Sequence, residues 1–233
     1  DKEDLTLFTA LYQEILSVKG ETKVLLQTYF GDVRDAFESI LALPFDGIGL
    51  DFLEGKETKN LVAKGFPKDK LLFAGLVNGK NIWRNHYEKT IEQVKDLEAK
   101  GISVVLGTSC SLLHVPYTLE GENKLSAEVK RHFSFAVEKL SELLDLKKVL
   151  SGKAESSVLE ENKALFASVR PNSEDKSVKE RCAAITDADY TRLPAFSERE
   201  EIQKEEFKLP LFPTTTIGSF PQSAEIRRHR AEA

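Results

Sequence analysis

The fold is decided by residues 71–108, LLFAGLVNGKNIWRNHYEKTIEQVKDLEAKGISVVLGT, in which two apolar runs flank a helical pattern. The runs at 71–77 and 102–108 are short and rich in strand-forming residues. Between them, apolar side chains recur every three or four residues, at Tyr87, Ile91, Val94 and Leu97. The stretch therefore predicts a strand, an amphipathic helix and a second strand.

The same alternation of strand and helix continues on both sides of this stretch. Near-continuous apolar strands between amphipathic helices indicate a parallel sheet buried on both faces, with the helices packed outside. Strand starts near 23, 46, 71 and 102 come close to the ~30 residues per unit of a (β/α)8 barrel. The other expected strands lie at 23–30 and 46–52, and the other expected helices lie over 33–41, capped by Asp32, and over 56–64. A helix over 3–19 should carry the apolar stripe Phe8, Leu11, Ile15 and Val18, and a long helix around 126–146 the stripe Val129, Phe133, Ala136, Leu140 and Leu143.

The predicted fold class is therefore α/β, a portion of a (β/α)8 TIM barrel with about four βα units. An open, doubly wound sheet would show the same alternation, but no G-x-G-x-x-G turn follows the first strand, which disfavours a dinucleotide-binding fold. After residue 150 the sequence pattern changes, and helices are expected near 157–168 and 174–185. Residues 186–213 are expected to be a charged connector with a helical part.

Composition excludes several classes of protein. With 41% hydrophobic and 30% charged residues the chain should form a core, and its net charge of −5 leaves only Arg227–Arg230 as a basic tract, which we expect to be a solvated helix face. With one short basic tract, no nucleic-acid partner is expected. No membrane partner is expected either, because the sequence has no long apolar run and no leader-like N-terminus. Cys110 and Cys182 do not suggest a disulfide framework. The absence of methionine suggests a piece of a longer protein.

Candidate functional residues follow the strands, because ligands of parallel α/β folds meet the carboxyl ends of strands. Asp51 could be a base or a ligand anchor, and a carboxylate there equally suits a structural role. Cys110 and His114 could pair as nucleophile and base, but they share one loop, and no third group that could orient the histidine is evident. The complete set is Tyr29, Asp32, Asp51, Glu54, Asn78, Lys80, Ser109, Cys110, Ser111 and His114.

Two further sequence features bear on ligands. Trp83 and Arg84 could cover a ligand in a loop, and a tryptophan after a strand equally suits a packing anchor. Ile217-Gly218-Ser219 ends an apolar run with backbone N–H groups beside a hydroxyl, which suits a small zwitterion's carboxylate or an ordinary glycine turn. No C-x-x-C, H-x-C or H-E-x-x-H motif is present, so no metal ligands are predicted in this chain.

Several strings carry a family resemblance. LPLFPTTTIGSFPQSAEIRRHR at 209–230 resembles the opening of the catalytic barrel of the cobalamin-independent methionine synthases, and GTSCSLLHVPYTLEGE at 107–122 resembles their N-terminal barrel. QTYFGDV at 27–33 and LVNGKNIWR at 76–84 fit the same N-terminal barrel. The resemblance spans essentially the whole chain in the family's order.

The resemblance implies a cytoplasmic enzyme of two (β/α)8 barrels that transfers a methyl group from 5-methyltetrahydropteroyl-polyglutamate to L-homocysteine, giving L-methionine. It implies zinc, which holds the homocysteine thiolate, and no cobalamin. The zinc ligands, the proton-donating histidine and the main folate contacts would lie outside this chain, in the remaining segments of the polypeptide, so no catalytic residue is expected here. Ile217, Gly218 and Ser219 would contact homocysteine. If the barrels arose by duplication, Ser109 and Ser111 would occupy ligand positions, and hydroxyls are poor zinc ligands.

The implied domain organisation divides the chain into four parts. They are 1–150, the second half of the N-terminal barrel; 151–185, a helical extension packing on it; 186–213, the inter-domain linker; and 214–233, the first strand and start of the catalytic barrel. The chain alone should then be inactive and serve mainly as scaffold. Two alternatives stay open: a stand-alone half-barrel binding or interaction module without catalysis, and a different (β/α)8 enzyme, such as a decarboxylase.

Overall fold

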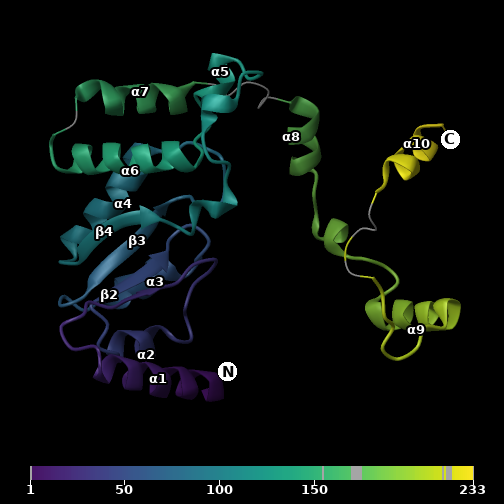
Figure 1. Cartoon of the computed structure of the whole chain (residues 1–233), viewed down its shortest axis with the longest axis horizontal. Helices are drawn as coiled ribbons and strands as arrows, with labels where there is room; N and C mark the ends of the chain where they lie inside the picture. The colour runs from purple at the N-terminus through teal and green to yellow at the C-terminus, as the bar shows by residue number, and fades with distance from the viewer. Residues whose placement is uncertain (1, 154, 169–174, 217, 219–221, 233) are drawn as a thin grey trace. The chain divides into compact units, whose positions relative to one another are not determined.

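The computed structural model describes residues 2–153, 155–168, 175–216, 218 and 222–232 (Figure 1). The chain divides into two compact units, Asp1–Glu174 and Asp175–Ala233. The first unit contains a sheet and the helices that cover it, and the second contains helices and irregular segments. Each unit is described separately.

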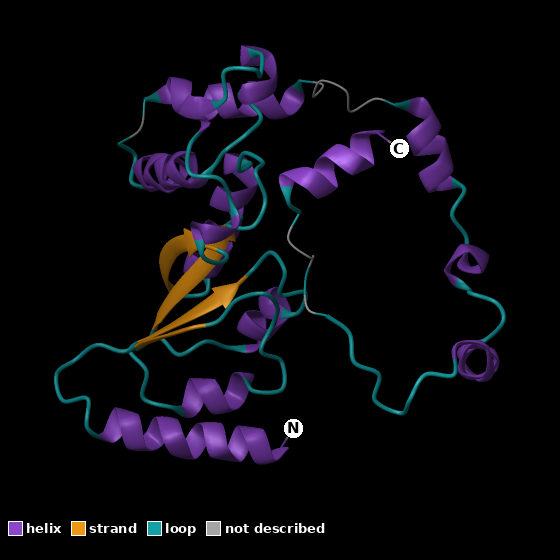
Figure 2. Cartoon of the chain, turned by 45° about the vertical axis from the view of Figure 1, so that its right-hand side comes forward, coloured by secondary structure: helices purple, strands orange, loops and turns teal. Residues whose placement is uncertain are grey.

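The first unit is built on a four-stranded parallel sheet (Figure 2). The strands follow one another in chain order, β1-β2-β3-β4, so every connection is a crossover through helical or loop segments. This confirms the predicted α/β fold, and the arrangement is that of part of a (β/α)8 barrel. The strands are β1 (Leu25–Gln27), β2 (Gly47–Asp51), β3 (Leu71–Val77) and β4 (Ser103–Thr108).

The helices of the first unit lie around this sheet (Figure 1). Helices α2, α3 and α4 follow β1, β2 and β3, as the alternating pattern predicts. The helix expected near 157–168 is also present, as α7. The helices are α1 (Lys2–Ser17), α2 (Phe37–Ala42), α3 (Thr58–Lys64), α4 (Tyr87–Ala99), α5 (Ala127–Lys130), α6 (Ala136–Leu150) and α7 (Ser156–Ala167), with short 3-10 turns at Leu112–His114 and Leu119–Gly121.

The prediction of one long helix around 126–146 was wrong, because the chain breaks between α5 and α6. Phe133 forms an antiparallel bridge with Trp83, and the Ser134 N–H donates to the Ile82 carbonyl at 2.7 Å. The Glu138 side chain accepts the Phe135 N–H at 3.1 Å and so starts a new helix at Ala136. These pairings with a distant loop satisfy backbone groups that a continuous helix would have bonded internally.

Two details of the predicted helices were also wrong. On α1 the side chains turned to the core are Phe8, Tyr12 and Leu16, whereas Leu11 and Ile15 are each 54% exposed. Val18, which follows the last residue of the helix, is 80% exposed. Sequence spacing alone allows either face when both carry apolar residues. Asp32, expected to cap the helix over 33–41, instead accepts the Glu57 N–H at the start of α3, and α2 begins only at Phe37.

The core of the first unit lies between the sheet and its helices. Ile48 and Leu72, neighbours in register, are fully buried there, together with Phe37 and Val94 from the helices. On the opposite face of the sheet, Gly47 leaves room for the Phe73 ring, which would lie 2.9 Å from an added Cβ. All five residues of β2 are buried, but β1 and β4 at the two edges are partly exposed. Burial on both faces is thus confirmed only for the centre of the sheet.

The second unit has no buried residue among those described. It consists of α8 (Lys176–Ala183), a 3-10 turn at Asp187–Tyr190, α9 (Phe196–Phe207) and α10 (Ala224–Glu232). The expected helices near 174–185 and within the connector are therefore confirmed, and the basic tract lies on the exposed surface of α10. Residues 214–216, part of the strand expected to open a second barrel, pair with no strand in the described part of the chain.

Candidate functional site at the carboxyl edge of the sheet

The loops that follow the four strands meet through side-chain contacts, as the parallel sheet requires. Lys80, after β3, lies 2.9 Å from a carboxylate oxygen of Glu54, after β2. Its ammonium group also lies over the Phe30 ring, 5.1 Å from the ring centre. The His114 ring, after β4, meets Phe30 edge-on at 5.1 Å. Four of the predicted loops are therefore brought together.

Asp51 occupies the centre of this edge and is 1% exposed. Its Oδ1 accepts the N–H groups of Leu53 at 2.8 Å and Glu54 at 2.9 Å, and its Oδ2 accepts the Phe30 N–H at 3.1 Å. Phe30 has φ +65°, a left-handed conformation that costs a non-glycine residue energy. The carboxylate therefore fixes two loops, and this supports the structural reading of Asp51 over a role as a base.

Asp32 is held in a similar way. The Arg34 guanidinium donates to both of its oxygens, at 2.6 and 2.7 Å, and the Glu57 N–H donates at 3.2 Å. The bonds from Arg34 are the main reason that the pKa of Asp32 falls to about 2 from its usual 3.8. An ionised carboxylate with these partners orders the loop after β1 and joins it to α3.

The acid stability of the chain should report on Asp32. A carboxylate whose pKa is lowered on folding stabilises the fold above its unfolded pKa, and this contribution is lost as the pH falls through the folded value. We expect the urea midpoint to fall between about pH 4 and pH 2, and to fall less steeply in Asp32→Asn. Parallel urea titrations at pH 2, 3, 4 and 7 measure this, and equal pH slopes in the two proteins would contradict it. Asp46 titrates in the same direction, since Lys19 lowers its pKa, and the variant retains this residual slope.

The segment around Cys110 is closely packed. Cys110 is 5% exposed, and burial raises the pKa of its thiol. The Ser109 hydroxyl accepts the Gly79 N–H at 3.2 Å, and a Cβ on Gly79 would lie 2.5 Å from the Cys110 carbonyl oxygen. A thiol that stays protonated in a packed setting is a poor nucleophile. The burial of Cys110 therefore supports a packing role over a role as nucleophile.

The described residues do not fit a zinc site. Ser109 is buried and engaged with Gly79, and the Ser111 hydroxyl caps the 3-10 turn by accepting the Leu113 N–H. Hydroxyls lack the donor strength of imidazole and thiolate for zinc. Within the part of the chain described, no three His, Cys, Asp or Glu side chains lie together as a metal site needs.

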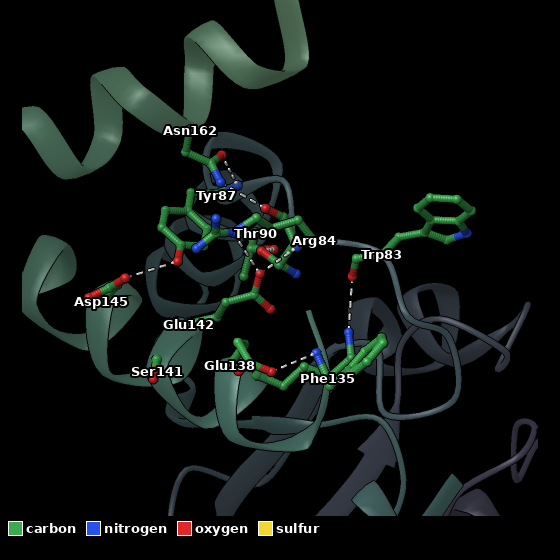
Figure 3. A network of polar contacts seen from close by, with 12 residues as sticks. Trp83, Arg84, Tyr87, Thr90, Phe135, Glu138, Ser141, Glu142, Asp145 and Asn162 are labelled. Carbon is green, nitrogen blue, oxygen red and sulfur yellow. Dashed lines mark hydrogen bonds and ion pairs between the residues drawn. The ribbon is translucent and has the colours of Figure 1, made fainter. Parts of the chain in front are cut away.

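Trp83 and Arg84 belong to the loop after β3. Side chains of α6 and α7 contact this loop (Figure 3). The Trp83 ring packs against Phe133, with ring centres 5.1 Å apart, which supports its reading as a packing anchor. The Trp83 carbonyl accepts the Lys139 ammonium at 3.0 Å. Arg84 Nε lies 3.7 Å from Glu142 Oε1, and the same oxygen accepts the Asn85 N–H at 2.9 Å.

The network continues into α7. Asn162 accepts the Tyr87 N–H at 3.0 Å and donates to the Asn85 carbonyl at 3.0 Å, and the Tyr87 hydroxyl donates to Asp145 at 3.1 Å (Figure 3). Glu142 is fully buried, and burial raises the pKa of its carboxyl, just as burial lowers the pKa of Lys139. These contacts bind the loop after β3 to α6 and α7.

Sequence reasoning missed this network because it placed the buried face of the 126–146 helix on Leu140 and Leu143. Leu140 is in fact 56% exposed, and Lys139, Glu142 and Leu146 form the buried face. These residues are separated by three and four positions, which is the spacing of one face of a helix, so the sequence did indicate a shared face. Charged residues are normally assigned to the solvent side, and only their partners in the 83–87 loop make this burial possible.

The predicted homocysteine contacts lie at the edge of the described chain. Ile217 and Ser219 are outside the described residues. Gly218 is exposed and has φ +77°, in the region that favours glycine.

No helix among the described residues combines the length and apolar character needed to cross a bilayer.

Known proteins resemble this chain over almost its whole length. Residues 1–101 match the family model described as the cobalamin-independent synthase, N-terminal domain. The chain is 52% identical over 230 residues to the 5-methyltetrahydropteroyltriglutamate–homocysteine methyltransferase of Campylobacter jejuni (strain RM1221), and 54% identical over 228 residues to the protein of that name from Streptococcus suis (strain 05ZYH33). Each match covers 98% of this chain and 30% of the relative. The chain is therefore similar, over almost its whole length, to one segment of these longer enzymes, and its residues 1–101 match the N-terminal domain of the cobalamin-independent synthases.

Proposed function

We propose that this chain is part of a cytoplasmic methyltransferase that moves a methyl group from 5-methyltetrahydropteroyl-polyglutamate to L-homocysteine and so produces L-methionine. The observation that supports this most strongly is 52–54% identity, over 98% of the chain, to enzymes named for that substrate pair. The chain spans 30% of the length of these relatives, so the activity is proposed for the longer enzyme.

In this proposal the segment acts mainly as scaffold. Asp51, Asp32 and Ser109 at the carboxyl edge of the sheet are engaged with backbone groups, and Lys80 is paired with Glu54. Side chains held in this way position loops and are not available as acids, bases or nucleophiles. We expect the isolated chain to show no methyl transfer.

The proposal keeps the implied division of the chain into 1–150, 151–185, 186–213 and 214–233. It also assigns zinc to the intact enzyme, with ligands in the remaining segments of the polypeptide, and no cobalamin. The description "cobalamin-independent" of the matching family model supports the latter.

The segment's direct contribution to substrate binding is proposed to be the loop Ile217-Gly218-Ser219, which contacts homocysteine. The support is the resemblance of the surrounding string and the positive φ of Gly218, which turns the backbone sharply beside a hydroxyl-bearing residue. Exposed backbone N–H groups in such a turn suit the carboxylate of an amino acid.

A substitution at Gly218 tests this loop. The segment of the Campylobacter jejuni enzyme that aligns with this chain is replaced by the chain, giving a full-length chimera. Gly218→Val in the chimera should raise the KM for homocysteine roughly tenfold or more, because strain of about 1–3 kcal/mol displaces the turn. Steady-state kinetics with homocysteine as the varied substrate measure the change.

The matched control is Gly152→Val, which places the same residue at an exposed glycine with φ +67°. It should lower stability to a similar degree and leave the KM for homocysteine unchanged. Equal KM values in Gly218→Val and the unaltered chimera would remove the loop from the homocysteine site.

A further inference from the structure

The first unit contains a cavity of about 420 Å³ whose walls come from the loop after β3, the start of α4, the end of α5, and the helices α6 and α7. This volume lies within the range of about 300–1,000 Å³ that is typical of small-molecule sites. The lining residues all belong to the segment 84–165, within the first unit, and none of them is a residue predicted at the strand ends. The cavity is therefore a separate candidate site.

Hydrogen bonds between helices fix the walls of this cavity (Figure 3). Tyr87 of α4 and Asn162 of α7 are both buried, and the Asn162 amide bonds to the Tyr87 N–H and to the Asn85 carbonyl, each at 3.0 Å. The Tyr87 hydroxyl donates to Asp145 Oδ2 at 3.1 Å. Because these lining side chains are held in place without a ligand, binding does not require them to be ordered.

Two guanidinium groups in the lining keep donors for a ligand. Arg84 Nε lies 3.7 Å from Glu142 Oε1, beyond hydrogen-bond distance, and the terminal amino groups of Arg84 donate to none of the described residues. Arg131, exposed at the end of α5, makes one long contact, 3.4 Å from its Nη2 to the Ser168 hydroxyl. A guanidinium with unused N–H groups binds a carboxylate through two parallel hydrogen bonds.

Two carboxylates line the same cavity. Asp145 Oδ2 accepts the Tyr87 hydroxyl, whereas Asp145 Oδ1 accepts no hydrogen bond from the described residues. Glu161 of α7 forms no ion pair within the described part of the chain. A carboxylate that has no cationic partner attracts an ammonium group.

The lining combines these balanced charges with an apolar wall, formed by Val158 and Leu165 of α7. An anion such as phosphate would meet the two arginines but would be repelled by the two carboxylates. A free amino acid at neutral pH carries one carboxylate and one ammonium group, so it matches both signs of charge. An aliphatic side chain on that amino acid would remove apolar surface of the wall from water.

We propose that this cavity binds a free amino acid with an aliphatic side chain, whose carboxylate is held by Arg84 and Arg131 and whose ammonium group is held by Asp145. The side chain of the ligand lies against the apolar wall of α7. The inference does not rest on the proposed methyl transfer, because the cavity is formed by the first unit, whereas the proposed homocysteine loop at 217–219 belongs to the second.

Isothermal titration calorimetry of the 233-residue chain with L-leucine tests the site. We expect one-to-one binding with a Kd of about 1 mM or tighter, as for a small ligand held by a few polar contacts. 3-Methylbutylamine, which lacks the carboxylate, and N-acetyl-L-leucine, which lacks the ammonium group, should each bind at least about tenfold more weakly. Absence of saturable L-leucine binding below about 10 mM, or equal affinity for the three compounds, overturns the proposal.

Substitutions in the lining test the role of each charge. Arg131→Gln, at an exposed residue, should weaken L-leucine binding at least about tenfold and leave the affinity for 3-methylbutylamine unchanged, because that compound has no carboxylate. Asp145→Asn should weaken L-leucine binding and leave the affinity for N-acetyl-L-leucine unchanged. Its amide oxygen can still accept the Tyr87 hydroxyl, so the wall is preserved.

The matched control is Arg228→Gln, at an exposed arginine of α10 that does not line the cavity. It should leave the affinity for L-leucine unchanged, and far-ultraviolet circular dichroism confirms that each variant is folded. L-leucine binding that neither Arg131→Gln nor Asp145→Asn weakens overturns the proposal. An equal loss for all three compounds also overturns it, because a distorted cavity gives that result without any specific charge contact.

Discussion

Leu72→Ala should lower the free energy of unfolding by about 3–5 kcal/mol, as expected for a cavity at a fully buried leucine. Leu72 is 0% exposed, lies in the central strand β3, and is in register with Ile48 and Val104 on the core face of the sheet. Neighbours on both sides are held in the sheet and cannot collapse into the space. Urea denaturation followed by circular dichroism measures the change.

Leu71→Ala is the matched control. Leu71 is the preceding residue, has the same side chain and is 44% exposed on the opposite face of the sheet. Its truncation should cost about 1 kcal/mol or less, since little apolar area returns to water. Equal losses for the two variants would contradict the register of β3.

Asp51→Ala is expected to cost about 3–5 kcal/mol, because it removes three hydrogen bonds to a charged group that are each worth about 1.5–3 kcal/mol, with partial replacement by water. The Phe30 N–H would lose the acceptor that holds a left-handed backbone conformation. The loops after β1 and β2 should loosen together, and urea denaturation should show the loss.

Asp51→Asn separates the hydrogen bonds from the charge. The amide oxygen can still accept the Leu53 and Glu54 N–H groups, but the amide nitrogen would face the Phe30 N–H. We expect an intermediate cost of about 1–2 kcal/mol. In the chimera, Asp51→Ala that keeps full stability but abolishes methyl transfer would contradict the structural role and favour a different (β/α)8 chemistry at this edge.

The sequence predicts the strands well because each is a short apolar run bounded by polar or glycine residues, as at 71–77 and 46–52. It predicts less well which side of a helix is buried. On α1 two apolar faces compete, and one is selected because Phe8, Tyr12 and Leu16 pack on the core, with Tyr12 against Phe45. The break between α5 and α6 depends on a bridge between Trp83 and Phe133, fifty residues apart in the chain, which local spacing cannot reveal.

For the candidate site, too, the sequence predicts some features well and others poorly. The parallel pattern correctly predicts that residues after the strands meet, and Lys80, Glu54, Phe30 and His114 do so. Their roles depend on hydrogen bonds that the strand pattern does not specify. Asp51 accepts the N–H groups of Leu53 and Glu54 in its own loop and that of Phe30 in another, and these bonds support a structural role. The buried pair Lys139 and Glu142 escaped prediction for the related reason that its partners belong to another loop.

In the proposed function these residues form a structural segment of a homocysteine methyltransferase. The most direct measurement is the rate of methyl transfer by the full-length chimera in which this chain replaces the aligned segment of the Campylobacter jejuni enzyme. We expect a rate within about tenfold of that of the unaltered enzyme, since 52% identity across the segment should preserve its contacts with the rest of the polypeptide. A folded chimera without methyl transfer would contradict it.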